Sequence, residues 1–265
     1  MLNLKKSLLI TSLFVCGQSL QAEKFGVVID KDRVAATFGN SGGSVFQYDE
    51  VGNLANEKRV SEAGKVLSER QYEYSDASKL WQVKDLLGDS VKSTHFGYDS
   101  LGRLTKVGDA SMSYNQFNMM EAFKKPGVDA RYTYNPLTGL RDAKVVNDKF
   151  TRFVLDDQER VVEERDMIGN VVSKITYDKN GPETYTRDGK TYRYVFNHLG
   201  DVVALKDSNG KVVNRYSYDV WGNLTLSQET VENPIRSRGE YYDSESGFYY
   251  LRGRYYDPNA RRFTT

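Results

Sequence analysis

The chain has 265 residues, a formal net charge of +1 and only two histidines. Residues 1–22 contain Lys5 and Lys6 and no acidic residue, so their removal lowers the net charge to −1. The remaining chain has neither the basic excess typical of a nucleic-acid-binding protein nor an acidic tail, and we expect no nucleic acid among its partners.

Residues 1–22 predict a secretion signal peptide: a basic start, an apolar run over Leu8–Val15 and a small, polar stretch that ends at Ala22. The run is too short to span a bilayer. An alternative is lipidation at Cys16, which would add a membrane anchor. Cys16 is the only cysteine, so a cleaved chain has no disulfide. We expect an exported protein that is periplasmic, at the cell surface or secreted.

The composition after the signal favours strands. The chain has 19 Tyr and 12 Phe but only 5 Pro, and aromatic and β-branched residues suit a pleated, half-buried surface. No long stretch has the helical spacing of apolar residues, and the one candidate, over 116–123, is weak. Residues 23–45 are interpreted as an N-terminal lead-in to an all-β domain.

A short motif, Tyr-Asp-x-x-Gly-Asn/Arg-Leu, recurs through residues 46–226. Its clearest copies supply the structural turn residues Tyr48, Asp49 and Gly52; Tyr98, Asp99 and Gly102; and Tyr218, Asp219 and Gly222. Weaker copies occupy residues 74–80, 155–161, 177–181 and 196–202, and the copy at 134–140 has one extra residue in its turn. A motif that returns every 16 to 26 residues indicates a repeat protein.

Each motif predicts a hairpin. Tyrosine ends a strand and packs its ring on the neighbouring strand, Asp accepts bonds from turn N–H groups, and Gly supplies positive φ. Ser78 and Glu159 replace that glycine, so we expect their turns to be strained or differently shaped. Hairpins that pair side by side bury a continuous face and twist. The predicted fold is all-β: antiparallel hairpin repeats coiled into a curved or partial shell-like sheet.

The last part of the chain, residues 233–265, is rich in Tyr-Tyr pairs. Its residues of interest are Tyr242, Asp243, Gly247, Tyr249, Tyr250, Arg254, Tyr255, Tyr256, Asp257 and Pro258. With the repeats, this stretch resembles the YD-repeat, or Rhs, family and its Rhs repeat-associated core. The resemblance implies a β-shell that the core closes at one end, with the tyrosines packed inward. It also implies that Arg252, Arg254, Arg261 and Arg262 pair with acids such as Glu240, Asp243 and Glu245. The sequence lacks the family's self-cleavage motifs and toxin domain, so we expect a short form.

No catalytic, cofactor-binding or metal-binding residue is predicted. Asp257-Pro258 is interpreted as a turn that ends a strand; the alternative is a self-cleaving aspartic pair with Asp243. His95 and His198 are too few for a zinc site. Trp81 and Trp221 are assigned to packing, with sugar stacking as the alternative.

We therefore expect a non-enzymatic scaffold or interaction protein of an Rhs-type polymorphic toxin or cell-surface system. Its expected partner is a co-encoded toxin, immunity or shell chain, or a second copy. Alternatives are a carbohydrate- or cell-surface-binding adhesin, a self-cleaving autoprotease and a decayed remnant without function. Residues 112–134 and 225–237 are predicted to be loops that carry binding.

Overall fold

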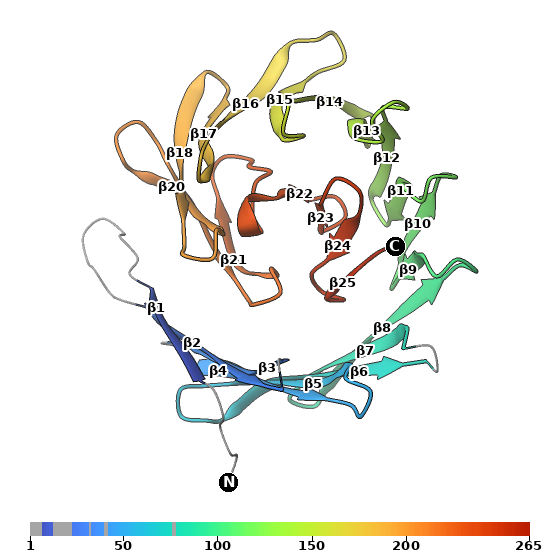
Figure 1. Cartoon of the computed structure of the whole chain (residues 1–265), viewed down its shortest axis with the longest axis vertical. Helices are drawn as coiled ribbons and strands as arrows, with labels where there is room; N and C mark the ends of the chain where they lie inside the picture. Colours follow the sequence, from blue (N-terminus) through green and yellow to red (C-terminus); the bar gives the residue numbers. More distant parts are fainter. Residues whose placement is uncertain (1–6, 13–22, 32, 40–41, 76–77) are drawn as a thin grey trace. The chain divides into compact units, whose positions relative to one another are not determined.

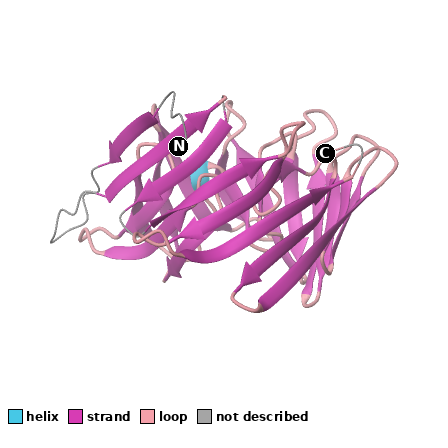
Figure 2. Ribbon diagram, turned by 90° about the horizontal axis from the view of Figure 1, so that it is seen from below, coloured by secondary structure: helices cyan, strands magenta, loops and turns pink. Residues whose placement is uncertain are grey.

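The computed structural model describes residues 7–12, 23–31, 33–39, 42–75 and 78–265. The chain divides into two compact units, Met1–Gly97 and Tyr98–Thr265. Strands dominate both, and the only helix among the described residues is one 3-10 turn, η1, over Ser237–Gly239 (Figure 2). Cys16 and most of the predicted signal lie outside the described residues; of the signal, only Ser7–Ser12 is described, as a strand.

The first unit is an antiparallel meander in which each strand pairs with the next. Its strands are β1 (Ser7–Ser12), β2 (Glu23–Asp30), β3 (Arg33–Gly39), β4 (Gly42–Tyr48), β5 (Leu54–Val60), β6 (Val66–Tyr74), β7 (Leu80–Leu87) and β8 (Ser90–Tyr98), whose last residue opens the second unit.

The second unit holds a longer meander and a small separate sheet. The meander consists of β9 (Leu104–Val107), β10 (Ala110–Tyr114), β11 (Met120–Lys125), β12 (Val128–Tyr134), β13 (Arg141–Val146), β14 (Lys149–Leu155), β15 (Val161–Arg165), β16 (Val171–Asp178), β17 (Gly181–Arg187), β18 (Lys190–Phe196), β19 (Val202–Lys206), β20 (Val212–Tyr218) and β21 (Leu224–Glu229). The small sheet contains β22 (Tyr241–Asp243), β23 (Phe248–Tyr250), β24 (Tyr255–Asp257) and β25 (Arg262–Phe263). The meander curves around the small sheet (Figure 1).

The repeat turns share one hydrogen-bond pattern. After Tyr98, the Gly102 N–H donates to the Asp99 carbonyl (3.0 Å), and Asp99 Oδ1 accepts from the N–H groups of Leu101 (3.0 Å) and Arg103 (2.9 Å). Gly102 has φ 83°, where a side chain would clash. The Arg103 side chain also donates to Asp99 Oδ2 (2.6 Å), which explains the Arg or Asn of the motif. The turns at Asp49–Asn53 and Asp219–Asn223 repeat this pattern, with φ 97° at Gly52 and 85° at Gly222.

The motif tyrosines link each repeat to the one before it. The Tyr74 hydroxyl donates to the Leu54 carbonyl (2.9 Å), and the Tyr218 hydroxyl donates to the Val202 carbonyl (2.8 Å). Leu54 and Val202 each begin the strand that follows the preceding turn. The same bond joins Tyr114 to Leu104, Tyr134 to Met120 and Tyr177 to Val161, and Tyr48 donates to Val34. These bonds add a second, side-chain connection to the backbone ladder, and the predicted curved sheet of antiparallel hairpins is confirmed.

Ser78 and Glu159 adopt the backbone conformation of the glycines they replace. Their φ angles are 54° and 62°, a region that disfavours residues with a Cβ. Both turns nevertheless keep the repeat's bonds, with N–H donation from Ser78 to the Ser75 carbonyl (2.8 Å) and from Glu159 to the Asp156 carbonyl (3.1 Å). Of the two expected alternatives, the turns show the strained backbone rather than a different shape, because these hydrogen bonds fix the turn.

One predicted loop is largely strand, and the other is strand only in part. Residues 112–134 contain the end of β10 and all of β11 and β12, so this prediction is wrong, as is the weak helical candidate over 116–123. Of the second loop, residues 225–229 belong to β21 and Ser237 begins η1, so the prediction of a loop holds for most of 230–236. Strand pairing with neighbours overrides weak local propensity here. Among the described residues, no helix has the length and apolar composition needed to cross a bilayer.

Candidate functional site

The C-terminal segment, residues 233–265, lies against one face of the β9–β21 meander, here called the inner face (Figure 1). Along β12 only every second side chain is buried, Ala130 and Tyr132, as expected for a strand with one covered face. Phe123 and Phe153 of the inner face meet Phe248 and Tyr241 of the segment edge to face, with ring centroids 5.7 and 5.3 Å apart. The aromatic residues of the segment thus complete the core of the second unit.

Three of the five segment tyrosines singled out from the sequence bond the meander through their hydroxyls. The Tyr250 hydroxyl accepts a hydrogen bond from the backbone N–H of Arg141 (2.8 Å), and the Tyr255 hydroxyl accepts one from Arg141 Nη1 (3.0 Å). The Tyr249 hydroxyl donates to the Gly222 carbonyl (2.8 Å). The other two predicted rings pack within the small sheet: Tyr242 on Tyr249 (centroids 5.1 Å apart) and Tyr256 on Phe263 (5.7 Å). Gly247, with φ 81°, donates its N–H to the Asp243 carbonyl and closes the β22–β23 turn.

Arg141 is the centre of the contact. It is only 1% exposed, and its Nη1 contacts Asp243 Oδ2 in an ion pair whose side chains are fully buried. Nε and Nη2 have no hydrogen-bond acceptor among the described residues. Aromatic rings surround the guanidinium instead, at centroid distances of 4.3 Å (Tyr250), 4.6 Å (Phe153), 5.2 Å (Tyr241), 5.4 Å (Tyr132) and 5.8 Å (Tyr255). Cation–π attraction takes the place of the missing acceptors.

Lys144 extends this ion pair into a four-residue cluster. Its Nζ lies 2.9 Å from Asp243 Oδ1 and 3.0 Å from both carboxylate oxygens of Glu245. Burial disfavours the charged carboxylate of Asp243, but Arg141 and Lys144 outweigh it and lower its pKa. Burial, and then the charge of Asp243, raise the pKa of Glu245. The cluster holds two cations and two acids, so it can be buried without net charge.

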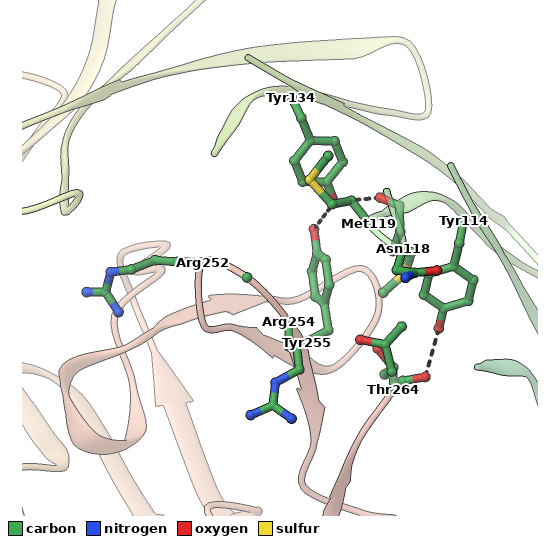
Figure 3. A pocket seen from close by; sticks show the side chains of 11 residues that line it. Tyr114, Asn118, Met119, Tyr134, Arg252, Arg254, Tyr255 and Thr264 are labelled. Carbon is green, nitrogen blue, oxygen red and sulfur yellow. Dashed lines mark hydrogen bonds between the residues drawn. The ribbon is translucent and has the colours of Figure 1, made fainter. Parts of the chain in front are cut away.

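The two ends of the meander also hold the segment. On the β9 side, the Leu104 N–H donates to the Thr264 carbonyl (2.8 Å), and Figure 3 shows the Tyr114 hydroxyl directed at the same carbonyl. The Tyr134 and Tyr255 hydroxyls meet at 3.3 Å (Figure 3). On the β21 side, the Asn223 side chain donates to the Pro258 carbonyl (2.8 Å). The segment therefore bridges both ends of the meander.

The resemblance implies ion pairs for four of the arginines in the segment, and the structure bears this out for Arg252, which pairs with a predicted acid, Glu240, at 3.3 Å. Arg254 packs over the Phe263 ring (3.7 Å), Arg261 over the Trp221 ring (4.9 Å), and Arg262 donates to the Tyr98 hydroxyl (3.3 Å). The prediction that Asp243 and Glu245 pair with segment arginines is wrong, because Arg141 and Lys144 of β13 reach these acids first.

Asp257 lies in a buried turn. Its Oδ1 accepts from the N–H groups of Asn259 (2.8 Å) and Ala260 (3.2 Å), which is the pattern of an Asx turn. Asp243, the alternative catalytic partner, has one carboxylate oxygen on Arg141 and the other on Lys144. Two such cations favour an ionised Asp243 rather than a carboxyl that shares a proton.

The tryptophans and histidines are not members of the cluster. Trp81 is 43% exposed on β7, and its ring is 5.7 Å from that of His95, which bonds the Gln82 side chain (3.0 Å). His198 is exposed in a repeat turn. Among the described residues, no three His, Cys, Asp or Glu side chains are grouped as a metal site needs.

A cavity of about 170 Å³ opens where the segment passes two repeat turns. Its wall includes Tyr177, Tyr241 and Tyr250 and the Arg252–Glu240 pair. Aromatic surface bordered by charge is suited to holding a partner's side chain.

Arg141 and Lys144 were missed by sequence reasoning, although a signal existed. In other repeats the residue paired with the motif tyrosine is apolar, as with Leu54 opposite Tyr48 and Leu224 opposite Tyr218. The extra turn residue in 134–140 shifts this position by one, so Arg141 faces Tyr134. An arginine at a position that repeats fill with leucine indicates a buried partner of opposite charge.

Comparison with known proteins agrees with this geometry. The teneurin YD-shell family model matches residues 19–265. The tRNA3(Ser)-specific nuclease WapA of Bacillus spizizenii and the tRNA nuclease WapA of Bacillus subtilis are each 32% identical to this chain over an alignment of 225 residues, and each match covers 76% of this chain. The chain spans about 10% of the length of either relative.

Solved structures share the fold at low identity. The TcdB2-TccC3-TEV crystal structure has a TM-score of 0.62 and 12% identity over 94% of this chain and 16% of its own. The Photorhabdus luminescens Tc holotoxin pore has a TM-score of 0.60 and 13% identity over 92% of this chain and 15% of its own. The family match agrees with three features of the molecule: the repeat motif, the curved meander and the segment docked on it. The chain belongs to the teneurin YD-shell family.

Proposed function

We propose that the chain is an exported, non-enzymatic scaffold that binds another protein chain in an Rhs-type toxin or cell-surface system. The observation that carries this proposal is the C-terminal segment, which is fixed on the inner face by the buried cluster and by bonds to both ends of the meander. A meander held rigid by its C-terminal segment is suited to binding a partner in one fixed position.

The relatives support a toxin setting. Two are named as WapA nucleases, and their match to this chain covers only about a tenth of their length. We propose that the chain supplies the shell part of such a system, and that a toxin, immunity or shell chain is its partner. Export is supported by residues 1–22, which have the composition of a signal peptide.

Co-expression tests the scaffold role. The chain is purified alone and together with the products of neighbouring reading frames, and masses are measured by light scattering during size exclusion. The proposal predicts a complex of fixed stoichiometry. It is abandoned when the chain stays monomeric at all concentrations and every neighbour elutes separately.

A second candidate, a carbohydrate-binding adhesin, is favoured by the exposed Trp81 ring beside His95. Glycan-array binding that is lost in Trp81→Ala supports the adhesin. A blank array removes it. Trp221, which already lies under Arg261, serves as the matched comparison, since Trp221→Ala should leave glycan binding unchanged.

A further inference from the structure

Three side chains in the buried cluster have the arrangement of a nucleophile, an electrophile and a proton carrier. Lys144 Nζ of β13 lies 2.9 Å from Asp243 Oδ1 of β22 and 3.0 Å from both oxygens of Glu245, two residues later. The side chains are 13%, 0% and 4% exposed. A lysine nitrogen held 2.9 Å from an oxygen of the carboxyl group is positioned beside its reaction partner, which raises the effective concentration of the two reactants.

Buried neighbours leave this pair little contact with solvent. The Tyr241 ring lies 5.4 Å from Lys144 Nζ, and the Tyr132 hydroxyl donates to Glu245 Oε1 (3.2 Å). Arg141, fully buried, contacts the other oxygen of Asp243. Exclusion of water favours condensation, because water is a product of amide formation and the reagent of its reversal.

We propose that Lys144 and Asp243 condense inside the folded chain to form an amide cross-link, with Glu245 as the proton carrier. This is a single reaction within one molecule, and it is separate from the scaffold role proposed above. It needs no oxidant, reductant or cofactor.

The condensation needs two proton transfers and releases one water. Glu245 takes a proton from the Lys144 ammonium and passes it to the Asp243 carboxylate, which gives a neutral amine and a neutral carboxylic acid. The amine nitrogen attacks the carboxyl carbon, a C–N bond forms, and the tetrahedral oxygen is stabilised by the Arg141 guanidinium. Glu245 then moves a proton from nitrogen to the departing hydroxyl. The C–O bond breaks, one water leaves, and Glu245 ends as a carboxylate.

Glu245 is suited to carry the proton because burial and Asp243 raise its pKa. The starting state is an ion pair, since Arg141 and Lys144 together lower the pKa of Asp243 despite its burial. The neutral pair is therefore a minor state and the reaction is slow. One turnover in the lifetime of the chain is sufficient.

The cross-link would join a strand of the meander to the C-terminal segment. The segment could then no longer leave the inner face, even when the chain unfolds, because the loop between the two linked residues stays closed. This is the effect that a disulfide has on a long loop, in a chain whose only cysteine is Cys16.

Intact mass spectrometry of the purified full chain tests the proposal. The wild-type chain is expected to be lighter than its processed sequence by one water, and a protease digest is expected to contain one branched peptide joining Lys144 to Asp243. Lys144→Arg and Glu245→Gln are expected to have their full sequence mass. Lys149→Arg is the matched control: Lys149 is exposed on the next strand, and its variant should keep the water loss and the branched peptide.

A wild-type chain with its full sequence mass after long incubation overturns the proposal, whatever the variants do. So does water loss that persists in Lys144→Arg, or that maps to a single unbranched peptide. Circular dichroism of each variant shows whether it is folded. Where a variant is unfolded, the mass of the wild-type chain alone decides whether the cross-link forms.

Discussion

Gly222 and Gly210 form a matched pair that measures the contact between the repeats and the C-terminal segment. Both are turn glycines with left-handed φ, 85° and 79°, and both donate their N–H to the aspartate three residues earlier. A Cβ on Gly210 would meet nothing within 4 Å, whereas a Cβ on Gly222 would lie 3.2 Å from Ser237 Oγ and 3.6 Å from the Tyr249 ring. Ser237 cannot easily retreat, because its hydroxyl donates to Asp201 (2.6 Å).

The magnitudes follow from these contacts. In Gly210→Ala the left-handed alanine costs about 1–2 kcal/mol, of which about 0.5–1 kcal/mol is returned by the stiffer unfolded chain. Gly222→Ala has the same strain and adds overpacking of about 1–3 kcal/mol. We therefore expect Gly222→Ala to lower the free energy of unfolding by about 2–4 kcal/mol, and Gly210→Ala by about 1 kcal/mol, on these grounds.

Urea unfolding followed by tryptophan fluorescence is the assay. Both variants are made in a Trp81→Phe background, so that the signal comes from Trp221, one residue before Gly222. Equal losses of stability in the two variants would refute the reasoning, because the segment would then not lie over the Gly222 turn.

Three further predictions concern single residues. Glu159→Gly should raise the free energy of unfolding by about 0.5–1 kcal/mol, since glycine adopts the φ of 62° without strain. Gln158→Gly in the same turn is the control and should lower the free energy of unfolding. Thermal unfolding of the two variants compares these effects. Tyr218→Phe should lose about 1 kcal/mol with its bond to the Val202 carbonyl, and an unchanged urea midpoint contradicts that bond. Asp219 should titrate above 3.8, because burial raises its pKa. The contribution of this residue to the free energy of unfolding is therefore fully present below pH 3.8 and is lost as the pH rises through the pKa of the folded state. Asp166, in an open turn, should titrate below 3.8, because bonds led by the Asn170 side chain lower its pKa; its contribution is present above 3.8 and lost as pH falls through the folded pKa. NMR titration of the side-chain carboxyl groups measures both pKa values. The same midpoint for Asp219 and Asp166 would contradict this prediction.

The fold could be predicted from the sequence because the information is local. A turn such as Asp99–Arg103 is specified by residues within five positions of one another, and its repetition specifies a meander. The hydroxyl bond from Tyr74 to Leu54 was not foreseen, although both residues belong to recognised motifs, because the ring was expected only to pack on its neighbour.

The buried cluster could not be predicted in the same way. Arg141 and Asp243 are 102 residues apart in sequence, and no periodicity relates them. Arginines and acids lie close together in the sequence of the C-terminal segment. The family resemblance accordingly implies ion pairs between residues of the segment itself. The curved meander instead brings β13 over β22, so that Asp243 meets two cations from a distant repeat.

Amide hydrogen exchange on the intact chain tests the central claim, that the C-terminal segment is docked on the inner face of the β9–β21 meander. The Leu104 amide donates to the Thr264 carbonyl and the Val202 amide to the Arg236 carbonyl, so both report on the segment from the meander side. We predict that these two amides, and those of β22 to β24, exchange as slowly as the central strands of the meander. Exchange of these amides within seconds, while the central strands stay protected, would contradict docking.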